Sequence, residues 1–233
     1  MRERAVLNCM SPPVEAVLFD IDNTLCEYRR SATELLPLAF EDAGVDPFFE
    51  AADYYARYGE FTDESADVQD LRERCFAAIA RDRDRDPETG RAVARAYAAR
   101  RDHANVFAPD GAREALETIA DEYAVAAVTN GGPEMQSTKL AALDLADHFP
   151  TVIHAGYDAP AKPAPEPFFA ALDALDVSPD RAVHVGDSLE SDVAGARAAG
   201  LRAAWLRNGD GPGEHDPDYV LTSIRDLAER PWR

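Results

Sequence analysis

The chain has 233 residues, enough for one substantial hydrophobic core or for a core domain that carries a smaller insertion. Its hydrophobic fraction of 46% is ordinary for a soluble globular protein, and no apolar run approaches the length that spans a bilayer. The formal net charge of −20 argues against a nucleic acid or an anionic membrane as partner, because both are polyanions. We expect a cytoplasmic protein, either a monomer or a homodimer.

The acidity has an unusual form. The chain contains 44 Asp and Glu against 24 Lys and Arg, and only Lys139 and Lys162 are lysines. Excess acid with almost no lysine is typical of proteins from cells with molar salt in the cytoplasm, where a Debye length of about 3 Å screens self-repulsion. A GC-rich genome would also replace Lys with Arg, but it would not by itself explain the acidity. We therefore predict a halophilic protein.

Residues 1–13 show no periodic pattern, and we expect an N-terminal extension there that need not be ordered. Its apolar segment, residues 5–7, is too short for a signal peptide. The three cysteines, Cys9, Cys26 and Cys75, lack the paired spacing of a zinc or redox site and are interpreted as ordinary thiols.

Residues 14–25, VEAVLFDIDNTL, begin with a nearly unbroken apolar run that predicts a buried strand. Because side chains alternate along a strand, Asp20 and Asp22 should leave it on the same side while Ile21 points back into the core. Two carboxylates so close repel each other unless a cation or a shared proton intervenes. The stretch therefore indicates a metal site, an acid/base pair or both, with an exposed turn as the plain alternative.

The segment 27–102 predicts an all-helical insertion. Ser31 can cap its first helix, which runs to Ala43, and Glu34 stands in position for a capping box. The charged run 81–86 is interpreted as a solvated face. Further helices are expected over residues 47–58, 64–82 and 88–101.

From residue 107 onward, strands and helices alternate. This order predicts right-handed crossovers and a parallel sheet covered on both faces. The fold class is therefore α/β: a Rossmann-like doubly wound parallel sheet core, formed by residues 14–26 and 103–233, with the helical segment inserted. Strands are expected at 123–128, 152–153, 181–185, 202–206 and 219–221, and helices at 111–122, 133–143, 166–175, 192–199 and 223–230.

Polar side chains follow three of these strands, and a fourth polar segment follows the short strand near residue 153. Carboxyl ends of parallel strands meet at one edge of a sheet, so we expect these groups to lie together. Each alone also fits a turn, a surface lysine or a helix cap. His184 lies inside a predicted strand and is interpreted as a packed residue, not a catalyst. The converging residues are Asp20, Asp22, Thr129, Asn130, Lys162 and Asp187.

This ordered set resembles the haloacid dehalogenase-like hydrolase superfamily. The family pattern is Asp-x-Asp-x-Thr, then Ser or Thr, then Lys, then Gly-Asp with further acid; it is matched at 20–24, 129, 162 and 186–192. The insertion directly after the first motif resembles the subfamily whose helical cap enters there. Residues 129–136 and 186–192 are also similar to the 5′-nucleotidase and phosphoglycolate phosphatase branches.

The resemblance implies that Asp20 is the nucleophile, forming an aspartyl-phosphate. Asp22 would be the general acid for the leaving oxygen and then the base that activates water. Mg²⁺ would be the cofactor, bound by Asp20, Asp187 and the backbone carbonyl of Asp22. Asp192 would support the metal through water or orient Lys162.

The remaining implied roles concern the phosphoryl group. Thr129 and the backbone of Asn130 would bind its oxygens, and Lys162 would neutralise charge that builds up in the transition state. The carboxyl of Asp22 favours phosphoester hydrolysis over carbon-halogen cleavage, because a halide needs no proton. The absence of lysine from residues 1–138 excludes the branch that forms a Schiff base with a cap lysine.

We therefore predict a magnesium-dependent phosphatase for a small phosphorylated metabolite. A phosphomutase would use the same core residues, and a catalytically idle phosphate-binding or regulatory protein could share the fold. The physiological substrate is left open. Candidate specificity residues in the insertion are Tyr28, Arg29, Arg57, Tyr58 and Arg72.

Overall fold

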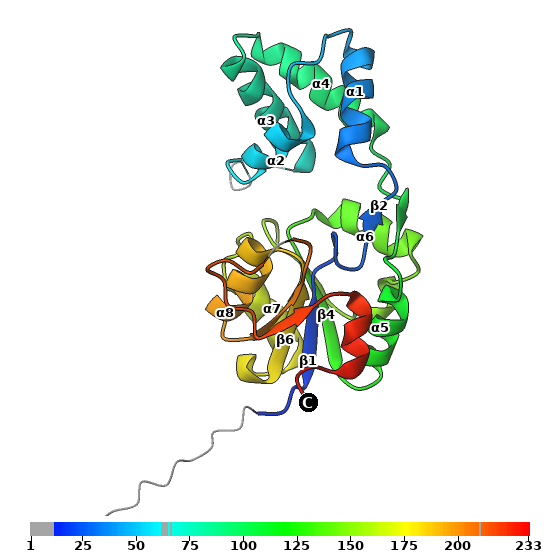
Figure 1. The fold of residues 1–233 in the computed structure, drawn as a ribbon, viewed down its shortest axis with the longest axis vertical. Helices are drawn as coiled ribbons and strands as arrows, with labels where there is room; N and C mark the ends of the chain where they lie inside the picture. Colours follow the sequence, from blue (N-terminus) through cyan, green and yellow to red (C-terminus); the bar gives the residue numbers. More distant parts are fainter. Residues whose placement is uncertain (1–11, 62–64, 66, 210) are drawn as a thin grey trace, which may run out of the picture.

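The computed structural model describes residues 12–61, 65, 67–209 and 211–233. Most of the expected N-terminal extension, with Cys9, lies outside the described residues. The chain forms two tiers, a parallel sheet flanked by helices and a separate group of helices beside one edge of that sheet (Figure 1). Within the described ranges, none of the helices combines the length and apolar character needed to cross a membrane.

A six-stranded parallel sheet forms the core, in the order β5-β4-β1-β6-β7-β8. β1 lies between β4 and β6, where Phe19 is in register with Ala127 on one side and Val185 on the other. The predicted α/β fold class is confirmed. The strands are β1 (Ala16–Phe19), β4 (Ala124–Thr129), β5 (Val152–His154), β6 (Ala182–Gly186), β7 (Arg202–Leu206) and β8 (Tyr219–Leu221).

Both faces of β1 are buried, which explains its continuous apolar sequence. Val17 and Phe19 pack with α5 (Ala112–Ala120), with residues at the end of α6 (Pro133–Ala142) and with the 3₁₀ helix η5 (Ile224–Glu229). Ala16 and Leu18 pack on the other face with α7 (Glu166–Leu175) and α8 (Ala194–Ala198). The polar residues that follow β1 are thereby delivered from a strand that is fixed on every side.

Four helices form the second group, hereafter the helical unit: α1 (Ala32–Ala43), α2 (Ala51–Tyr58), α3 (Val68–Asp82) and α4 (Pro87–Arg100). They share a hydrophobic cluster of their own, in which the rings of Phe49 and Phe76 lie 4.8 Å apart between centroids. The predicted capping box of Ser31 and Glu34 is present at the start of α1. Residue 64, the predicted start of the third helix, lies outside the described residues; α3 begins at Val68 behind the cap residue Asp67.

Two short strands connect the helical unit to the sheet. β2 (Glu27–Tyr28) pairs antiparallel with β3 (Val106–Phe107), so both chain crossings run side by side. The all-helical interpretation of residues 27–102 is therefore wrong at its first two residues. A strand of two residues is too short to show alternating hydrophobicity, and its partner β3 lies far away in the sequence. No local pattern therefore predicts it.

The segment predicted as one helix over 192–199 has a different form. Residues Leu189–Val193 make a π-helical turn, η4, and α8 follows from Ala194. The predicted last helix, 223–230, is a 3₁₀ helix. π-helical turns are rare and often occur at functional sites. This one carries Asp192, whose position is described below.

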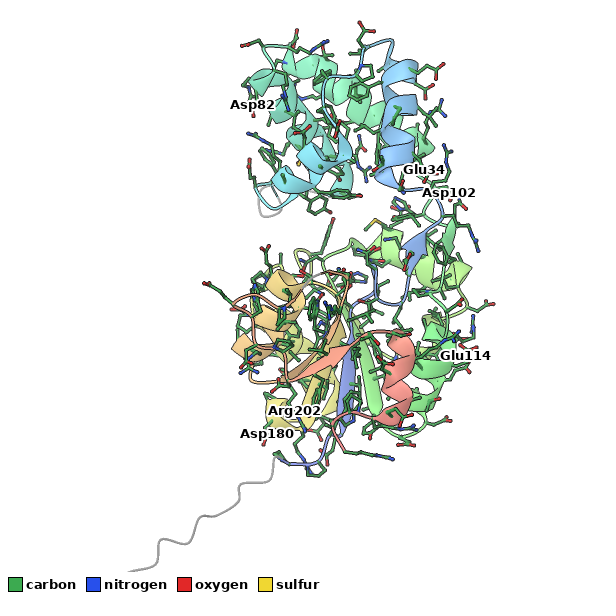
Figure 2. All side chains as sticks on the ribbon, in the orientation of Figure 1. Glu34, Asp82, Asp102, Glu114, Asp180 and Arg202 are labelled. Carbon is green, nitrogen blue, oxygen red and sulfur yellow. The ribbon has the colours of Figure 1, made fainter. Side chains whose placement is uncertain are left out.

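Acidic side chains cover the outside of both tiers. Glu34 and Asp82 on the helical unit and Glu114 on α5 are exposed and point away from the molecule (Figure 2). The mutual repulsion of such groups is the physical basis of the salt prediction made below.

We expect Gly90→Ala to destabilise the helical unit. A Cβ atom at Gly90 of α4 would lie 2.2 Å from the backbone carbonyl oxygen of Phe76 in α3, so the two helices would have to separate. Overpacking of this kind costs about 1–3 kcal/mol, more than the roughly 1 kcal/mol that Ala gains in a helix. Gly59→Ala is the matched control, because nothing lies within 4 Å of its Cβ position. Thermal unfolding at fixed salt measures both, and equal melting temperatures would refute the close approach.

Candidate active site

The Lys162 ammonium occupies the centre of the site. It lies in the loop after β5, is only 5% exposed, and donates hydrogen bonds to three oxygens. These are Oδ1 of Asp20 at 2.8 Å, Oδ1 of Asp192 at 2.6 Å and the carbonyl oxygen of Val128 at 2.7 Å. Burial alone would lower the pKa of Lys162, but the carboxylates of Asp192 and Asp20 outweigh it and raise the pKa. Lys162 therefore stays protonated and places a positive charge next to the Asp20 carboxylate.

Asp192 is held by Lys162 and by two further groups. Its Oδ1 lies 2.9 Å from Nε2 of the buried His184, and its Oδ2 accepts the backbone N–H of Ser188 at 3.0 Å. Burial opposes its charge, but Lys162 and then His184 lower its pKa. At Gly186 a Cβ atom would lie 2.3 Å from Cγ of Asp192, so only glycine leaves room for this carboxylate. The contact with Lys162 matches one of the two roles expected for Asp192, and the contact with His184 was not anticipated.

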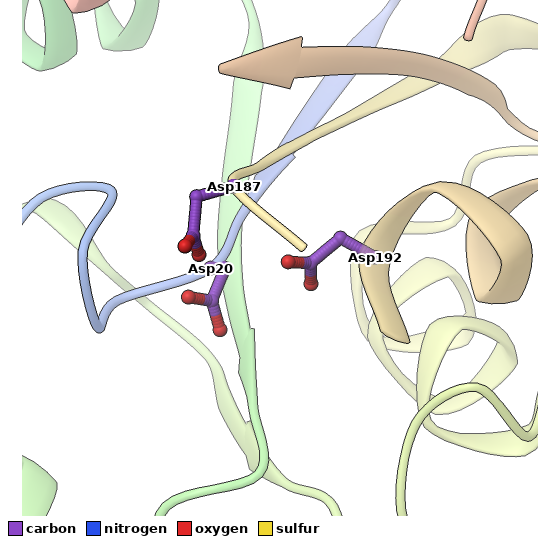
Figure 3. A group of neighbouring side chains, drawn as sticks. All are labelled: Asp20, Asp187 and Asp192. Atoms are coloured by element: carbon purple, nitrogen blue, oxygen red, sulfur yellow. The ribbon is translucent and has the colours of Figure 1, made fainter. Parts of the chain in front are cut away.

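Three carboxylates converge at the carboxyl edge of the sheet. Asp20, Asp187 and Asp192 each offer an oxygen, and these oxygens all lie within 4.8 Å of one another. The carboxylates of Asp20 and Asp187 lie close together, with that of Asp192 to one side (Figure 3).

This cluster carries more negative charge than its single lysine balances. Burial and then Asp192 raise the pKa of Asp187 to about 6, and the hydrogen bond that Asp187 receives at 3.0 Å comes from the neutral amide of Asn208. Burial also raises the pKa of Asp20, despite Lys162. A hard divalent cation that prefers oxygen ligands would relieve both effects. The donor set therefore fits a site for a divalent metal ion.

Thr129 is the last residue of β4 and Asn130 follows it, and both line the inner side of the site with the carboxylates. Oγ1 of Thr129 accepts two hydrogen bonds, from the N–H of Gly131 at 3.1 Å and from Nε2 of Gln136 at 2.9 Å. A hydroxyl has two acceptor positions and one proton, so the proton of Thr129 remains to be donated. Asn130 exchanges two hydrogen bonds with the backbone of Lys162, at 2.8 and 3.1 Å. The side chain of Asn130 thus fixes the lysine loop, a role that the sequence analysis did not predict.

Two residues of α6 were missed altogether. Lys139 is 1% exposed, and its Nζ lies 2.5 Å from Oδ1 of Asp22, while Nε2 of Gln136 donates to Oδ2 of Asp22 at 2.7 Å. Lys139 is one of only two lysines in the chain and stands three residues after Gln136, on the same helix face. That rarity and spacing were the signal available in the sequence.

Two adjoining hollows open around these groups. The inner hollow, about 240 Å³, is lined by Asp20, Thr129, Lys162 and Asp187 among others. The outer hollow, about 270 Å³, lies toward the helical unit. The two hollows adjoin, because they share four lining residues. The shared residues are Asp22, Asn23, Tyr58 and Met135.

The five candidate specificity residues divide into two groups. Tyr28, Tyr58 and Arg72 line the outer hollow. Arg29 instead donates to the carbonyl oxygen of Val106, and Arg57 forms an ion pair with Asp82 at 2.5 Å. The structure therefore removes Arg29 and Arg57 from the candidates.

Residues 14–200 match the family of haloacid dehalogenase-like hydrolases. The chain belongs to this family. The predicted resemblance is thereby confirmed, and the matched region of this haloacid dehalogenase-like hydrolase contains every carboxylate and both lysines described above.

Two phosphatases resemble this haloacid dehalogenase-like hydrolase over more than nine-tenths of its length. Phosphoserine phosphatase of Thermus thermophilus is 31% identical over 92% of this chain and 98% of its own. Glyceraldehyde 3-phosphate phosphatase of Methanopyrus kandleri is 29% identical over 93% of this chain and 96% of its own.

Solved structures agree with the fold. A HAD phosphatase from Thermococcus onnurineus, 27% identical, superposes with a TM-score of 0.60 over 93% of this chain and 97% of its own. The HAD hydrolase YfnB of Bacillus subtilis, described as bound to magnesium, gives a TM-score of 0.74 over 94% and 99% of the two chains. At 21% identity it supports the fold alone.

Proposed function

We propose that the chain is a magnesium-dependent phosphatase that hydrolyses a small phosphorylated metabolite through an aspartyl-phosphate on Asp20. Its class, phosphoric monoester hydrolase, follows from family membership and from the phosphatases among its full-length relatives. The observation that carries the mechanism is the position of the Asp20 carboxylate. It borders the inner hollow, 2.8 Å from Nζ of Lys162 and within 4.8 Å of a carboxylate oxygen of Asp187.

Small substrates are supported by the named relatives, one of which acts on phosphoserine and another on glyceraldehyde 3-phosphate. The size of the two hollows agrees with a ligand of this kind.

In the first step, an oxygen of Asp20 would attack phosphorus and the bond from phosphorus to the leaving oxygen would break. Asp22 would give that oxygen a proton. In the second step, Asp22 would take a proton from water as the water attacks the aspartyl-phosphate, which releases phosphate and restores both carboxyl groups. Lys139 and Gln136 hold Asp22 at the junction of the two hollows, where a leaving oxygen and then water would lie.

The phosphoryl oxygens need positive charge and hydrogen-bond donors. Lys162 supplies a buried cation, and the unused proton of Thr129 supplies a donor at the same hollow. The side chains of Asp20 and Asp187 and the backbone carbonyl of Asp22 would hold Mg²⁺, with Asp192 behind them. When bound, Mg²⁺ would neutralise charge where the phosphate meets the carboxylates.

The proposal is tested by release of inorganic phosphate from p-nitrophenyl phosphate. We expect turnover with Mg²⁺, loss of turnover when a chelator removes the metal, and recovery when Mg²⁺ is restored in excess. Phosphate binding without turnover would instead favour an idle phosphate-binding protein. Isomerisation of a sugar phosphate without release of phosphate would favour a mutase.

We further propose that the protein is adapted to high salt, and we expect its melting temperature to rise with KCl. The exposed acidic side chains repel one another at low ionic strength, and raising KCl from about 0.2 M to about 2 M screens them. Each kcal/mol of repulsion removed should raise the melting temperature by roughly 3 °C in a chain of this size. Thermal unfolding across the series measures the effect. A melting temperature independent of KCl would contradict the adaptation.

A further inference from the structure

The outer hollow has a composition unlike the rest of this acidic chain. Among the described residues, its lining includes the side chains of Arg72, Arg101 and Lys139 and one carboxylate, that of Asp22. Asp22 pairs with Lys139 at 2.5 Å, and in the part of the chain that the structure describes no carboxylate forms an ion pair with either arginine. The aromatic part of the lining consists of Tyr28, Tyr54, Tyr55, Tyr58 and Tyr97.

Arg72 is the central group. Its side chain projects from α3 and is 5% exposed, and among the described residues no carboxylate forms an ion pair with it. The hydrogen bond that Arg72 donates to Oε1 of Gln69 is long at 3.4 Å, and its guanidinium also interacts with the Tyr54 hydroxyl. Its Nε is buried without a hydrogen-bond partner in the described structure. A buried guanidinium without an ion-pair partner and with an unpaired N–H lowers the stability of the fold unless an anion binds to it.

Arg101 adds a second charge that is fixed in place. One of its terminal nitrogens donates to the carbonyl oxygen of Arg30 at 2.6 Å, another donates to the Tyr97 hydroxyl, and its guanidinium lies 4.3 Å from the centre of the Tyr28 ring. Because these partners are neutral, they do not cancel the positive charge of Arg101. That charge therefore contributes to the electrostatic potential in the outer hollow.

The three cations also act on His103, whose Nδ1 lies 2.6 Å from the Tyr28 hydroxyl oxygen. Its pKa is lowered to about 4, first by burial and then by Lys139, Arg72 and Arg101.

The position of the outer hollow determines which part of a ligand would enter it. A phosphoryl group on Asp20 occupies the inner hollow, and the two hollows meet at Asp22, which faces the leaving oxygen in the proposed reaction. A leaving group that passes Asp22 would therefore extend into the outer hollow, toward Arg72.

We propose that the outer hollow is a subsite for a second anionic group, so that the substrate is a phosphate monoester whose leaving group carries a carboxylate or a further phosphate. Arg72 is the specificity residue, because its planar donors match either oxyanion in a bidentate manner. The tyrosine rings and hydroxyls line the remainder of the leaving group. This proposal rests on the phosphatase function proposed above.

The test compares kcat/KM for matched alkyl phosphates in the presence of Mg²⁺. Glycerol 3-phosphate carries a neutral leaving group, 3-phosphoglycerate a carboxylate, and propane-1,3-diol bisphosphate a second phosphate. We expect at least one charged probe to exceed glycerol 3-phosphate by about 10-fold to 100-fold, the worth of hydrogen bonds to a charged group. Which of the two charged probes is preferred identifies the oxyanion.

Variants assign the effect to Arg72. Arg72→Gln should reduce the ratio of charged to neutral probe to near one, and Arg72→Lys should restore part of it. Arg57→Gln is the matched control, because Arg57 also belongs to the helical unit but pairs with Asp82 away from the hollow. Its ratio should equal that of the unmodified protein.

The outcomes separate the two proposals. If the unmodified protein does not hydrolyse p-nitrophenyl phosphate, the phosphatase function fails. If it hydrolyses that compound but gives a ratio near one, the subsite fails while the phosphatase stands, and this holds even if Arg72→Gln does not fold. An equal loss of the ratio in Arg57→Gln would also overturn the assignment.

Discussion

Asp20→Asn should lower kcat for phosphate release by on the order of 10⁴-fold to 10⁶-fold, the range known for removal of a covalent nucleophile. Asparagine cannot carry the phosphoryl group as an acyl phosphate, and its neutral amide weakens the carboxylate cluster around the proposed Mg²⁺. Rapid quenching followed by intact mass measurement should detect a phosphorylated form of the unmodified protein and none in the variant.

Asp110→Asn is the matched control for this experiment. The Asp110 side chain is 98% exposed and lies outside both hollows, so the same chemical change should leave turnover intact. A phosphoryl group that persists on the Asp20→Asn protein, or turnover within about tenfold of the original, would exclude Asp20 as the nucleophile.

Lys162→Met should destabilise the metal-free protein by about 3–5 kcal/mol, because it leaves the buried carboxylates of Asp20 and Asp192 without their cation. In a chain of this size the melting temperature should fall by roughly 10 °C. Phosphatase activity should be lost as well, since the buried positive charge beneath the phosphoryl site is removed.

The other lysine of the chain provides the comparison. Lys139 is equally buried, but its partner Asp22 is 35% exposed at the side chain and water can solvate the remaining charge. Lys139→Met should therefore cost less than half as much stability as Lys162→Met. Chemical unfolding of both variants at one salt concentration measures the difference. Equal losses would show that the two buried carboxylates are not what makes Lys162 important.

Local patterns explain the parts of the fold that could be predicted. The apolar run of β1 reflects burial on both faces, and the capping box at Ser31 needs only residues three positions apart. The fold class followed from the alternation of strands and helices, and the convergence of Asp20, Lys162 and Asp187 followed from the geometry of parallel sheets.

The remaining features depend on contacts between distant segments. Gln136 and Lys139 reach Asp22 only because α6 lies across the edge of the sheet, and no pattern within α6 specifies that orientation. Arg57 and Arg72 are both arginines of the helical unit. Arg57 nevertheless pairs with Asp82, while Arg72 lines the outer hollow. The difference arises from how α2 and α3 pack, which the sequence alone did not reveal.

The central place of β1 has a consequence for synthesis on the ribosome. β1 precedes every other described strand, yet its two neighbours begin only at Ala124 and Ala182. At about 5–20 residues per second, the segment Ala16–Phe19 waits roughly 10–30 s before its second neighbour has been made. The helical unit emerges in between and can collapse on its own cluster. Until translation has passed β6, the apolar segment of β1 lacks one of its two strand partners, and we expect it to be a site of aggregation in the nascent chain.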